Sequence, residues 1–162
     1  MNINLIGIIT LGGIVMKNIG LLLSSITGFF IILGCLFYNS LLIDMDKIKD
    51  YVTESNSILQ EVIENEDKVN NKKGDYISRL IKIKKGMENS KTSFLFDKYK
   101  LIKISSIELL IEVINENNED DKKEYLKLVF EANNESQKEL DTLMDKNFME
   151  VTYLCLKSYI TT

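Results

Sequence analysis

The feature that most constrains this chain is an uncharged, strongly apolar run from Ile19 to Ile43, after which charged residues become dense. The run is 25 residues long, and between Ile3 and Ile43 the chain carries a single charge, Lys17. As a helix rising ~1.5 Å per residue, the run would extend ~38 Å, enough to cross a ~30 Å hydrocarbon layer with tilt. We therefore expect a membrane helix over residues 19–43, with the other 119 residues on one side of the bilayer.

The apolar run supports two interpretations. In the first it is a signal anchor that stays in the bilayer, with Tyr38 near an interface. In the second, export begins from Met16 and Lys17, and the sequence Ile-Leu-Gly-Cys that ends at Cys35 resembles a bacterial lipobox, in which the cysteine is lipidated. The residues after Cys35 stay apolar, whereas a mature lipoprotein usually begins polar, so an ordinary membrane cysteine is the simpler interpretation. Cys35 is nevertheless the candidate lipidation site.

The sequence does not decide the role of residues 3–16 or the orientation of the anchor in the membrane. Residues 3–16 are apolar but short for a second span, and they fit an extension of the anchor, a re-entrant piece or a mis-assigned translation start. The positive-inside rule gives close to a tie, because Lys17 precedes the run and Lys47 and Lys49 follow it. An N-terminal anchor before a larger domain is the commoner arrangement for export, so we expect the domain to be extracytoplasmic.

The composition favours long helices and argues against one class of partner. Proline is absent from the 162 residues, where average usage near 5% would give ~8, and proline both breaks helices and is common in loops. The bias toward Ile, Lys and Asn is typical of an AT-rich, bacterial genome. After the run, 24 acidic residues against 19 basic ones give a net charge of −5. Nucleic acid is a poor partner for such a domain, because its affinity comes mainly from cationic contacts.

The sequence after the run is predicted to form helices throughout. The first helix continues from the membrane run, because apolar residues recur there at the alternating spacings of three and four that define a heptad seam. It is expected to end at residues 70–74, where Gly74 suits a helix C-cap. A second helix begins near Asp75, and residues 89–93 favour a break after it. The predicted seam positions are Met45, Ile48, Val52, Ser55, Leu59, Val62, Glu66 and Val69.

The third predicted helix, at about residues 93–117, is apolar around most of its circumference. A single narrow polar stripe runs along it, made of Ser105, Glu108, Glu112, Glu116 and Glu119. Such a helix needs cover on several sides, so it is either the central helix of its own bundle or a surface for a partner, a second copy or lipid. The candidate core or partner residues are Leu101, Ile104, Ile107, Leu110, Ile111 and Ile114.

A fourth helix is predicted after the polar turn, with Asp120 or Asp121 as its N-cap. Its seam comprises Leu126, Val129, Ala132 or Asn133, Ser136, Leu140 and Leu143. The tail, residues 148–162, has strand propensity but no evident pairing partner, so we expect continued helix. One face of that helix would carry Phe148, Val151, Leu154 or Cys155, and Tyr159.

These segments predict an all-α architecture. A hydrophobic N-terminal segment, residues 1–43, supplies a transmembrane helix at about residues 19–43. Residues 44–147 follow as a three- or four-helix antiparallel bundle of coiled-coil-like character, because short polar turns make sequential helices antiparallel neighbours. The tail, residues 148–162, completes the chain.

Charge is segregated along the predicted bundle. Residues 79–103 carry eight basic and two acidic residues, net +6, and residues 108–124 carry seven acidic and two basic residues, net −5. One interpretation is internal complementarity, in which the basic helices face the acidic sides of the first and fourth predicted helices and each exposed pair contributes ~1 kcal/mol or less. The other is contact with anionic lipid or wall polymer, because the second helix would return the basic segment toward the bilayer. The candidate contacts are Lys84, Lys85, Lys91, Lys98, Lys100 and Lys103.

The chemical inventory is thin, and it predicts neither an enzyme nor a cofactor or metal site. The chain has no histidine, no cysteine pair with metal spacing and no glycine-rich phosphate loop. We expect a single-pass membrane protein whose bundle is an extracytoplasmic interaction or structural module of the cell envelope. Its expected partners are membrane lipid and either an unidentified protein or a second copy. The alternative is a cytoplasm-facing accessory, regulatory or immunity-type protein that uses residues 79–103 on anionic lipid or nucleic acid. A sensor-like four-helix input domain also suits the architecture.

Overall fold

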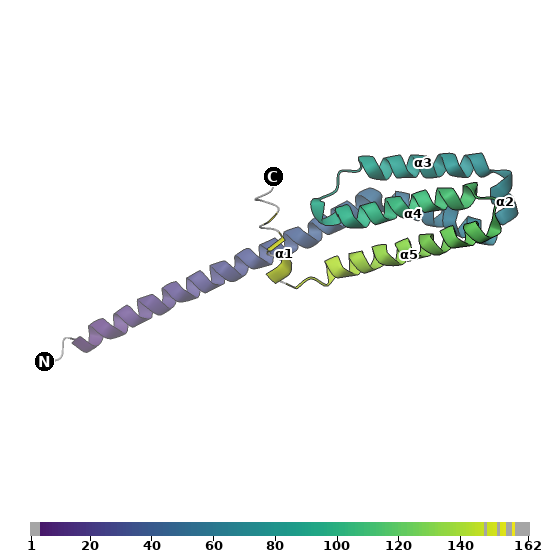
Figure 1. Cartoon of the computed structure of the whole chain (residues 1–162). Coiled ribbons are helices and arrows are strands. Elements are labelled where there is room, and N and C mark those ends of the chain that lie inside the picture. Colours follow the sequence, from purple (N-terminus) through teal and green to yellow (C-terminus); the bar gives the residue numbers. More distant parts are fainter. Residues whose placement is uncertain (1–3, 148, 152, 155–156, 158–162) are drawn as a thin grey trace. The chain divides into compact units, whose positions relative to one another are not determined.

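The computed structural model describes the backbone of residues 4–147, 149–151, 153–154 and 157, and the side chains of those residues from Leu23 onward. Within these residues every regular element is a helix, and no strand occurs. The all-helical prediction is therefore confirmed for the described part of the chain. The elements in order are α1 (Asn4–Glu64), α2 (Glu66–Asn71), α3 (Lys73–Asn89), the 3-10 helix η1 (Phe94–Phe96), α4 (Asp97–Asn115) and α5 (Glu119–Met144), as labelled in Figure 1.

The chain divides into two compact units. One comprises residues 1–37 and 147–162, which are the N-terminal part of α1 and the C-terminal tail. The other comprises residues 38–146 and contains the rest of α1 together with α2, α3, η1, α4 and α5.

The tail becomes helical again because Asn147 caps it. The Asn147 side-chain oxygen accepts hydrogen bonds from the backbone N–H groups of Met149 at 3.0 Å and Glu150 at 3.1 Å. In return, Glu150 accepts one from the Asn147 backbone N–H at 3.0 Å, which makes a reciprocal capping box. Residues 149–151, 153–154 and 157 are helical, as expected of the tail. The expected positions at Phe148, Cys155 and Tyr159 lie outside the described residues.

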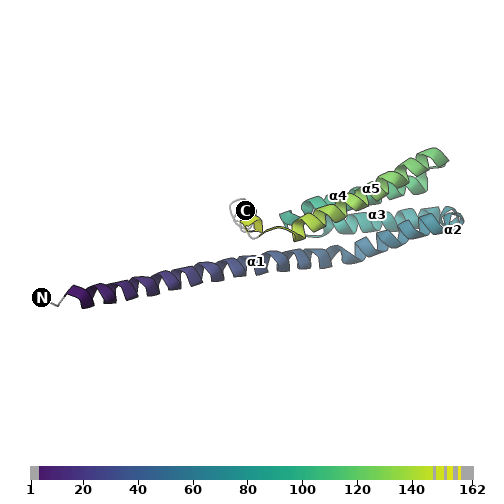
Figure 2. The same cartoon turned by 90° about the horizontal axis from the view of Figure 1, so that it is seen from below.

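The unit of residues 38–146 is an antiparallel four-helix bundle formed by α1, α3, α4 and α5. Its first pair shows the direction plainly: Glu61 of α1 meets Tyr76 near the start of α3, and Glu54 meets Arg79 one turn later. As residue numbers fall along α1 they therefore rise along α3. The helices of this unit run side by side in both Figure 1 and Figure 2.

Helix α4 is the central helix of the bundle, packed on both α3 and α5. It runs antiparallel to α3, because Lys73 reaches Asn115 and Lys84 reaches Glu108. It runs antiparallel to α5 as well, because Lys98 reaches Glu139 and Lys103 reaches Asn133. Ser105, Glu108 and Glu112 of the predicted polar stripe are exposed. The packing agrees with the interpretation of this segment as the covered helix of its own bundle. Its buried residues are Tyr99, Lys103, Ile104, Ser106, Ile107, Leu110, Val113 and Ile114.

The buried face of α1 differs from the predicted seam at alternate positions. Asp44 and Ile58 are buried where Met45 and Leu59 were expected, and the latter two are only half-buried. The predicted heptad spacing is correct, but spacings of three and four fit two overlapping stripes of residues on α1. The sequence prediction followed the stripe with apolar Met45 rather than the stripe that contains Asp44. The buried heptad positions in this unit are Leu41, Asp44, Ile48, Ser55, Ile58 and Val62.

Two predicted helix ends are also wrong in detail. Gly74 is not a C-cap, because α1 already ends at Glu64 and Gly74 lies in the first turn of α3. The N-cap of α5 is Asn118, whose side-chain oxygen accepts from the Asp120 backbone N–H at 3.0 Å. The acidic residues that were expected to cap lie instead in the first helical turn, where negative charge favours the helix dipole.

Candidate functional site

Tyr38, the first residue of the bundle unit, lies beside the end of α5. Its hydroxyl donates long hydrogen bonds to the backbone carbonyls of Met144 at 3.4 Å and Lys146 at 3.5 Å. The free carbonyls at a helix C-terminus need such donors. The last helix of the bundle therefore returns to the point where α1 enters it.

Asp44 holds the connection between α3 and α4 at this same end. One carboxylate oxygen accepts the Ser93 backbone N–H at 2.7 Å, and the other accepts the Lys47 ammonium at 2.9 Å. Lys47 also donates to the Lys91 carbonyl at 2.7 Å. We call this end of the bundle, made of residues 38–47, 90–96 and 144–146, the proximal end.

The Asp44 carboxyl is almost completely buried, with 2% of the residue exposed. Burial raises the pKa of this carboxyl, but the hydrogen bonds from Ser93 and Lys47 outweigh it and hold the pKa below its ordinary value. The group is therefore a charged carboxylate with a donor on each oxygen. Sequence reasoning missed it, although continuing the heptad four residues back from Ile48 leads to Asp44.

Two of the candidate basic residues form ion pairs between helices. Lys84 of α3 lies 2.6 Å from Glu108 of α4, and Lys98 of α4 pairs with Glu139 of α5. The hydrogen bond to each glutamate raises the pKa of its lysine. These pairs follow the expectation of internal complementarity. Glu139 lies on the fourth predicted helix, and Arg79 of the same basic segment pairs with Glu54 of α1, as expected. Glu108, on α4, is a partner that was not expected.

Lys103 is the one candidate lysine that lies inside the bundle. Its ammonium donates to the Asn133 side-chain oxygen at 2.9 Å, and Ser106 donates to the same oxygen at 3.3 Å. Burial lowers the pKa of the Lys103 amine, whose nitrogen lies 6.0 Å from the centre of the Tyr99 ring. Lys103 therefore belongs to a buried polar cluster with Ser106 and Asn133 at the α4–α5 interface, and the prediction that it contacts an external anionic surface is wrong.

The remaining candidate lysines lie on the surface or near it. Lys100 donates to the Ser90 carbonyl at 2.9 Å, so it also holds the α3–α4 connection. Lys85 and Lys91 are exposed, and within the described part of the chain neither side chain makes a hydrogen bond or ion pair. Of the six, these two are the exposed lysines whose side chains have no partner within the described residues, so they are available to an external anionic partner.

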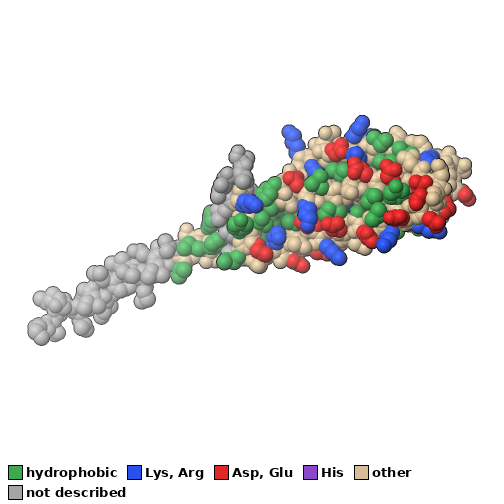
Figure 3. Space-filling model, viewed as in Figure 1, with side chains coloured by type: hydrophobic (Ala, Val, Ile, Leu, Met, Phe, Trp, Pro, Cys, Tyr) green, Lys and Arg blue, Asp and Glu red, His purple; other side chains and the backbone are tan. Residues whose placement is uncertain are grey.

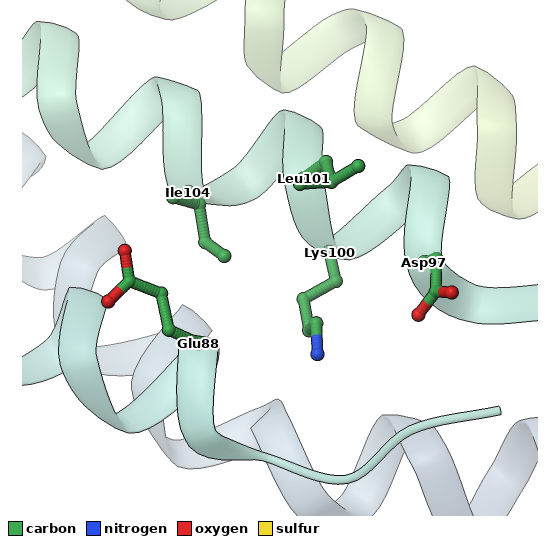
Figure 4. A pocket seen from close by; sticks show the side chains of 5 residues that line it. All are labelled: Glu88, Asp97, Lys100, Leu101 and Ile104. Carbon is green, nitrogen blue, oxygen red and sulfur yellow. The ribbon is translucent and has the colours of Figure 1, made fainter. Parts of the chain in front are cut away.

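A hollow of about 360 Å³ opens between the end of α3 and the start of α4 (Figure 4). Figure 4 shows Lys100 extending from α4 toward the chain that leaves α3, with Glu88 on the opposite wall. A second hollow of about 280 Å³ between α1 and α4 is lined by Met45, Lys49, Val52, Thr53 and Tyr99. Among the described residues no cluster of three or more acidic or cysteine side chains could hold a metal ion.

The predicted core or partner residues of α4 differ in burial, and Cys35, the candidate lipidation site on α1, is exposed. Leu101 is 63% exposed at the edge of the larger hollow, whereas Ile111 is half-buried. Cys35 is a free, exposed cysteine within helical α1. The four candidates buried in the bundle are Ile104, Ile107, Leu110 and Ile114.

The described N-terminal part of α1 is apolar and poorly covered. By length and composition α1 could cross a membrane, and only 11% of its most apolar 18-residue window is buried. Figure 3 shows hydrophobic side chains gathered there, whereas on the bundle acidic and basic side chains are interspersed with hydrophobic ones. The exposed large apolar residues before Asp44 are Leu23, Ile26, Phe29, Ile31, Ile32, Leu36, Tyr38, Leu42 and Ile43.

Comparison with protein-family models, curated proteins and solved structures finds no match for this chain. Its class is therefore defined by the fold alone. It is an all-helical protein with one long apolar N-terminal helix and an antiparallel bundle of four helices.

Proposed function

We propose that α1 anchors this chain in a membrane and that the bundle is an interaction or structural module of the cell envelope. The observation that carries the proposal is the distribution of exposed apolar side chains around α1. At ~100° per residue, Leu23, Ile26 and Phe29 project at ~60° intervals, and Ile31 and Ile32 project on the other side. An amphipathic core helix would leave one polar face exposed, whereas this segment is apolar on every side.

The energetic cost of leaving these side chains in water supports the same conclusion. Burying a Leu, Ile or Phe side chain is worth ~1.5–3 kcal/mol, so the group between Leu23 and Ile43 would forgo more than ~10 kcal/mol in water. A domain has a total stability of only ~5–15 kcal/mol. Hydrocarbon removes that cost, and residues 19–43 are long enough to span it.

We place the bundle on the extracytoplasmic side, where its partners would be envelope proteins or a second copy of the chain. A second candidate is a cytoplasm-facing accessory or regulatory protein that uses its basic segment on anionic lipid. The accessible side chains of Lys85 and Lys91 favour that candidate. The lysine counts on the two sides of the run do not separate the two orientations.

Cysteine labelling in intact cells tests both the anchor and the orientation. Asn117 lies exposed between α4 and α5, and unlike Asn118 it caps no helix, so Asn117→Cys introduces a reporter at little structural cost. The background carries Cys155→Ser, and the matched control is that background without the new cysteine. The probe is a membrane-impermeant maleimide, with lysed cells as the positive control for labelling.

The outcomes separate the proposals. Labelling of the Asn117→Cys variant in intact cells supports the extracytoplasmic module, and labelling only after lysis supports the cytoplasm-facing candidate. Release of the protein from membranes by alkaline carbonate would refute the anchor itself, because an inserted helix resists such extraction. A control that labels as strongly as the variant would show that Cys35 lies outside the bilayer, which also contradicts the anchor.

A further inference from the structure

The proximal end of the bundle is tied to the first turn of α1 after the apolar run. This inference rests on the proposed anchor. Asp44 directly follows the run, and Lys47 lies ~6 Å along the helix from Ile43. Their bonds to Ser93 and to the Lys91 carbonyl hold the α3–α4 connection within about one helical turn of the end of the run.

The connection carries an exposed aromatic side chain beside an exposed lysine. Phe94 is 46% exposed, although Phe96, two residues later, is fully buried with its ring 4.7 Å from that of Tyr99. Phe96 therefore packs in the core of the bundle, whereas the Phe94 side chain is exposed to solvent. Met144, at the end of α5 beside Tyr38, is exposed to a similar degree.

The charges at this end suit a bilayer surface better than those at the opposite end. Residues 90–96 contain one charge, Lys91. The proximal end as a whole carries three acidic and three basic residues, net 0, and Glu88 and Asp97 flank the connection. At the opposite end, residues 64–73 and 119–124 carry seven acidic and five basic residues, net −2. An anionic membrane surface would repel that end.

We propose that Phe94 and Lys91 dock the bundle onto the surface of the bilayer that holds α1. Phe94 lies at the boundary between headgroups and acyl chains, where aromatic side chains are favoured, and Lys91 meets anionic headgroups. Asp44 and Lys47 act as positioning residues, because they hold the connection against α1.

A tryptophan substitution tests the docking directly, because the chain contains no tryptophan of its own. The full-length Phe94→Trp variant is reconstituted into phosphatidylcholine vesicles with and without phosphatidylglycerol. The matched control is Phe130→Trp, since Phe130 on α5 is 47% exposed, almost the same as Phe94. Each tryptophan is quenched separately by lipids brominated near the headgroup and by aqueous iodide.

Docking predicts that brominated lipid quenches the tryptophan at position 94 several-fold more than the one at position 130, and that iodide does the reverse. Equal quenching of the two tryptophans by both agents would overturn the inference while leaving the anchor intact. If the protein washes off the vesicles in alkaline carbonate, the anchor fails instead. The two failures are therefore distinguishable.

The lysine contact is tested in the Phe94→Trp protein by Lys91→Gln. Loss of one lysine near an anionic surface should lower the ratio of docked to undocked bundle by about fivefold in vesicles with phosphatidylglycerol. Without phosphatidylglycerol the ratio should not change. Lys123→Gln is the matched control, because Lys123 is exposed near the start of α5 at the opposite end. It lies next to Lys122, which pairs with Glu66 of α2. Equal effects of the two substitutions would overturn the assignment of Lys91.

Discussion

Gly86 of α3 lies directly against the ring of Tyr51 on α1. A Cβ atom built on Gly86 would lie 2.5 Å from Cε1 and 2.6 Å from Cζ of that ring. Carbon atoms in favourable contact are ~3.5–4.0 Å apart, so the ring would have to move by about 1 Å. Gly86→Ala therefore tests whether this close approach of α1 and α3 exists.

Two effects of opposite sign decide the magnitude. Overpacking of a well-packed interface costs ~1–3 kcal/mol, and replacement of a mid-helix glycine by alanine contributes ~1 kcal/mol in the other direction. The net expectation for Gly86→Ala is a loss of about 1 kcal/mol. In a Tyr51→Ala background the ring is gone, so the same substitution should stabilise the bundle by ~1 kcal/mol. The sign reversal corresponds to a coupling energy of ~2 kcal/mol between the two positions.

The assay is urea unfolding of the full chain in detergent micelles, followed by circular dichroism for the wild type, both single variants and the double variant. Gly74→Ala is the control, because Gly74 is also in α3 but nothing lies within 4 Å of its added Cβ atom. It should stabilise the protein equally in both backgrounds. If Gly86→Ala also stabilises equally in both, the packing of α3 on Tyr51 described above is incorrect.

Two further substitutions test the buried charged groups. Asp44→Asn should cost about 1.5–3 kcal/mol at neutral pH, because it removes charge-assisted hydrogen bonds to Ser93 and Lys47. The folded-state pKa of Asp44 lies below its unfolded value, so its stabilisation is present above an unfolded pKa of ~3.9 and is lost as pH falls through the folded pKa. Urea unfolding should show the gap to wild type closing in acid, and a gap independent of pH would contradict this role. Lys103→Met should stabilise the protein by ~1–2 kcal/mol at neutral pH, because the buried amine has a neutral amide rather than a carboxylate as its acceptor. Burial lowers the folded-state pKa of Lys103, so the unfolded chain binds more protons and wild-type stability rises as pH approaches the ordinary value of 10.5. The difference between the two proteins should therefore shrink at alkaline pH, and a destabilised Met variant would show that the Asn133 bond outweighs the burial penalty.

The sequence predicts the helical segments well because their breaks are chemically marked. The polar connection at residues 90–93 and the turn before α5 both lie where turn-forming residues cluster. Helix α4 was expected to be covered on several sides from its apolar circumference alone, and it is. Helix formation depends on local periodicity, which a single sequence displays directly.

The buried polar groups could not be predicted in the same way. Pattern reasoning assigns Asp44 and Lys103 to solvent, because charged residues are rarely buried unless paired. The partners that make their burial acceptable are Ser93, 49 residues away from Asp44, and Asn133, 30 residues away from Lys103. Such distances along the chain carry no periodic signal.

The order in which the helices pair has a consequence for synthesis. Antiparallel neighbours along the chain form most of the bundle, and folds rich in such local contacts form quickly, in microseconds to milliseconds. The hydrogen bond from Tyr38 to the Met144 carbonyl is among the longest-range contacts described above, because it joins residues 106 apart. Helix pairs can therefore assemble one after another as the chain emerges, but the last closure waits for the end of α5. A chain that stalls earlier would leave the apolar face of α4 uncovered, which makes the unfinished protein the form most prone to aggregate.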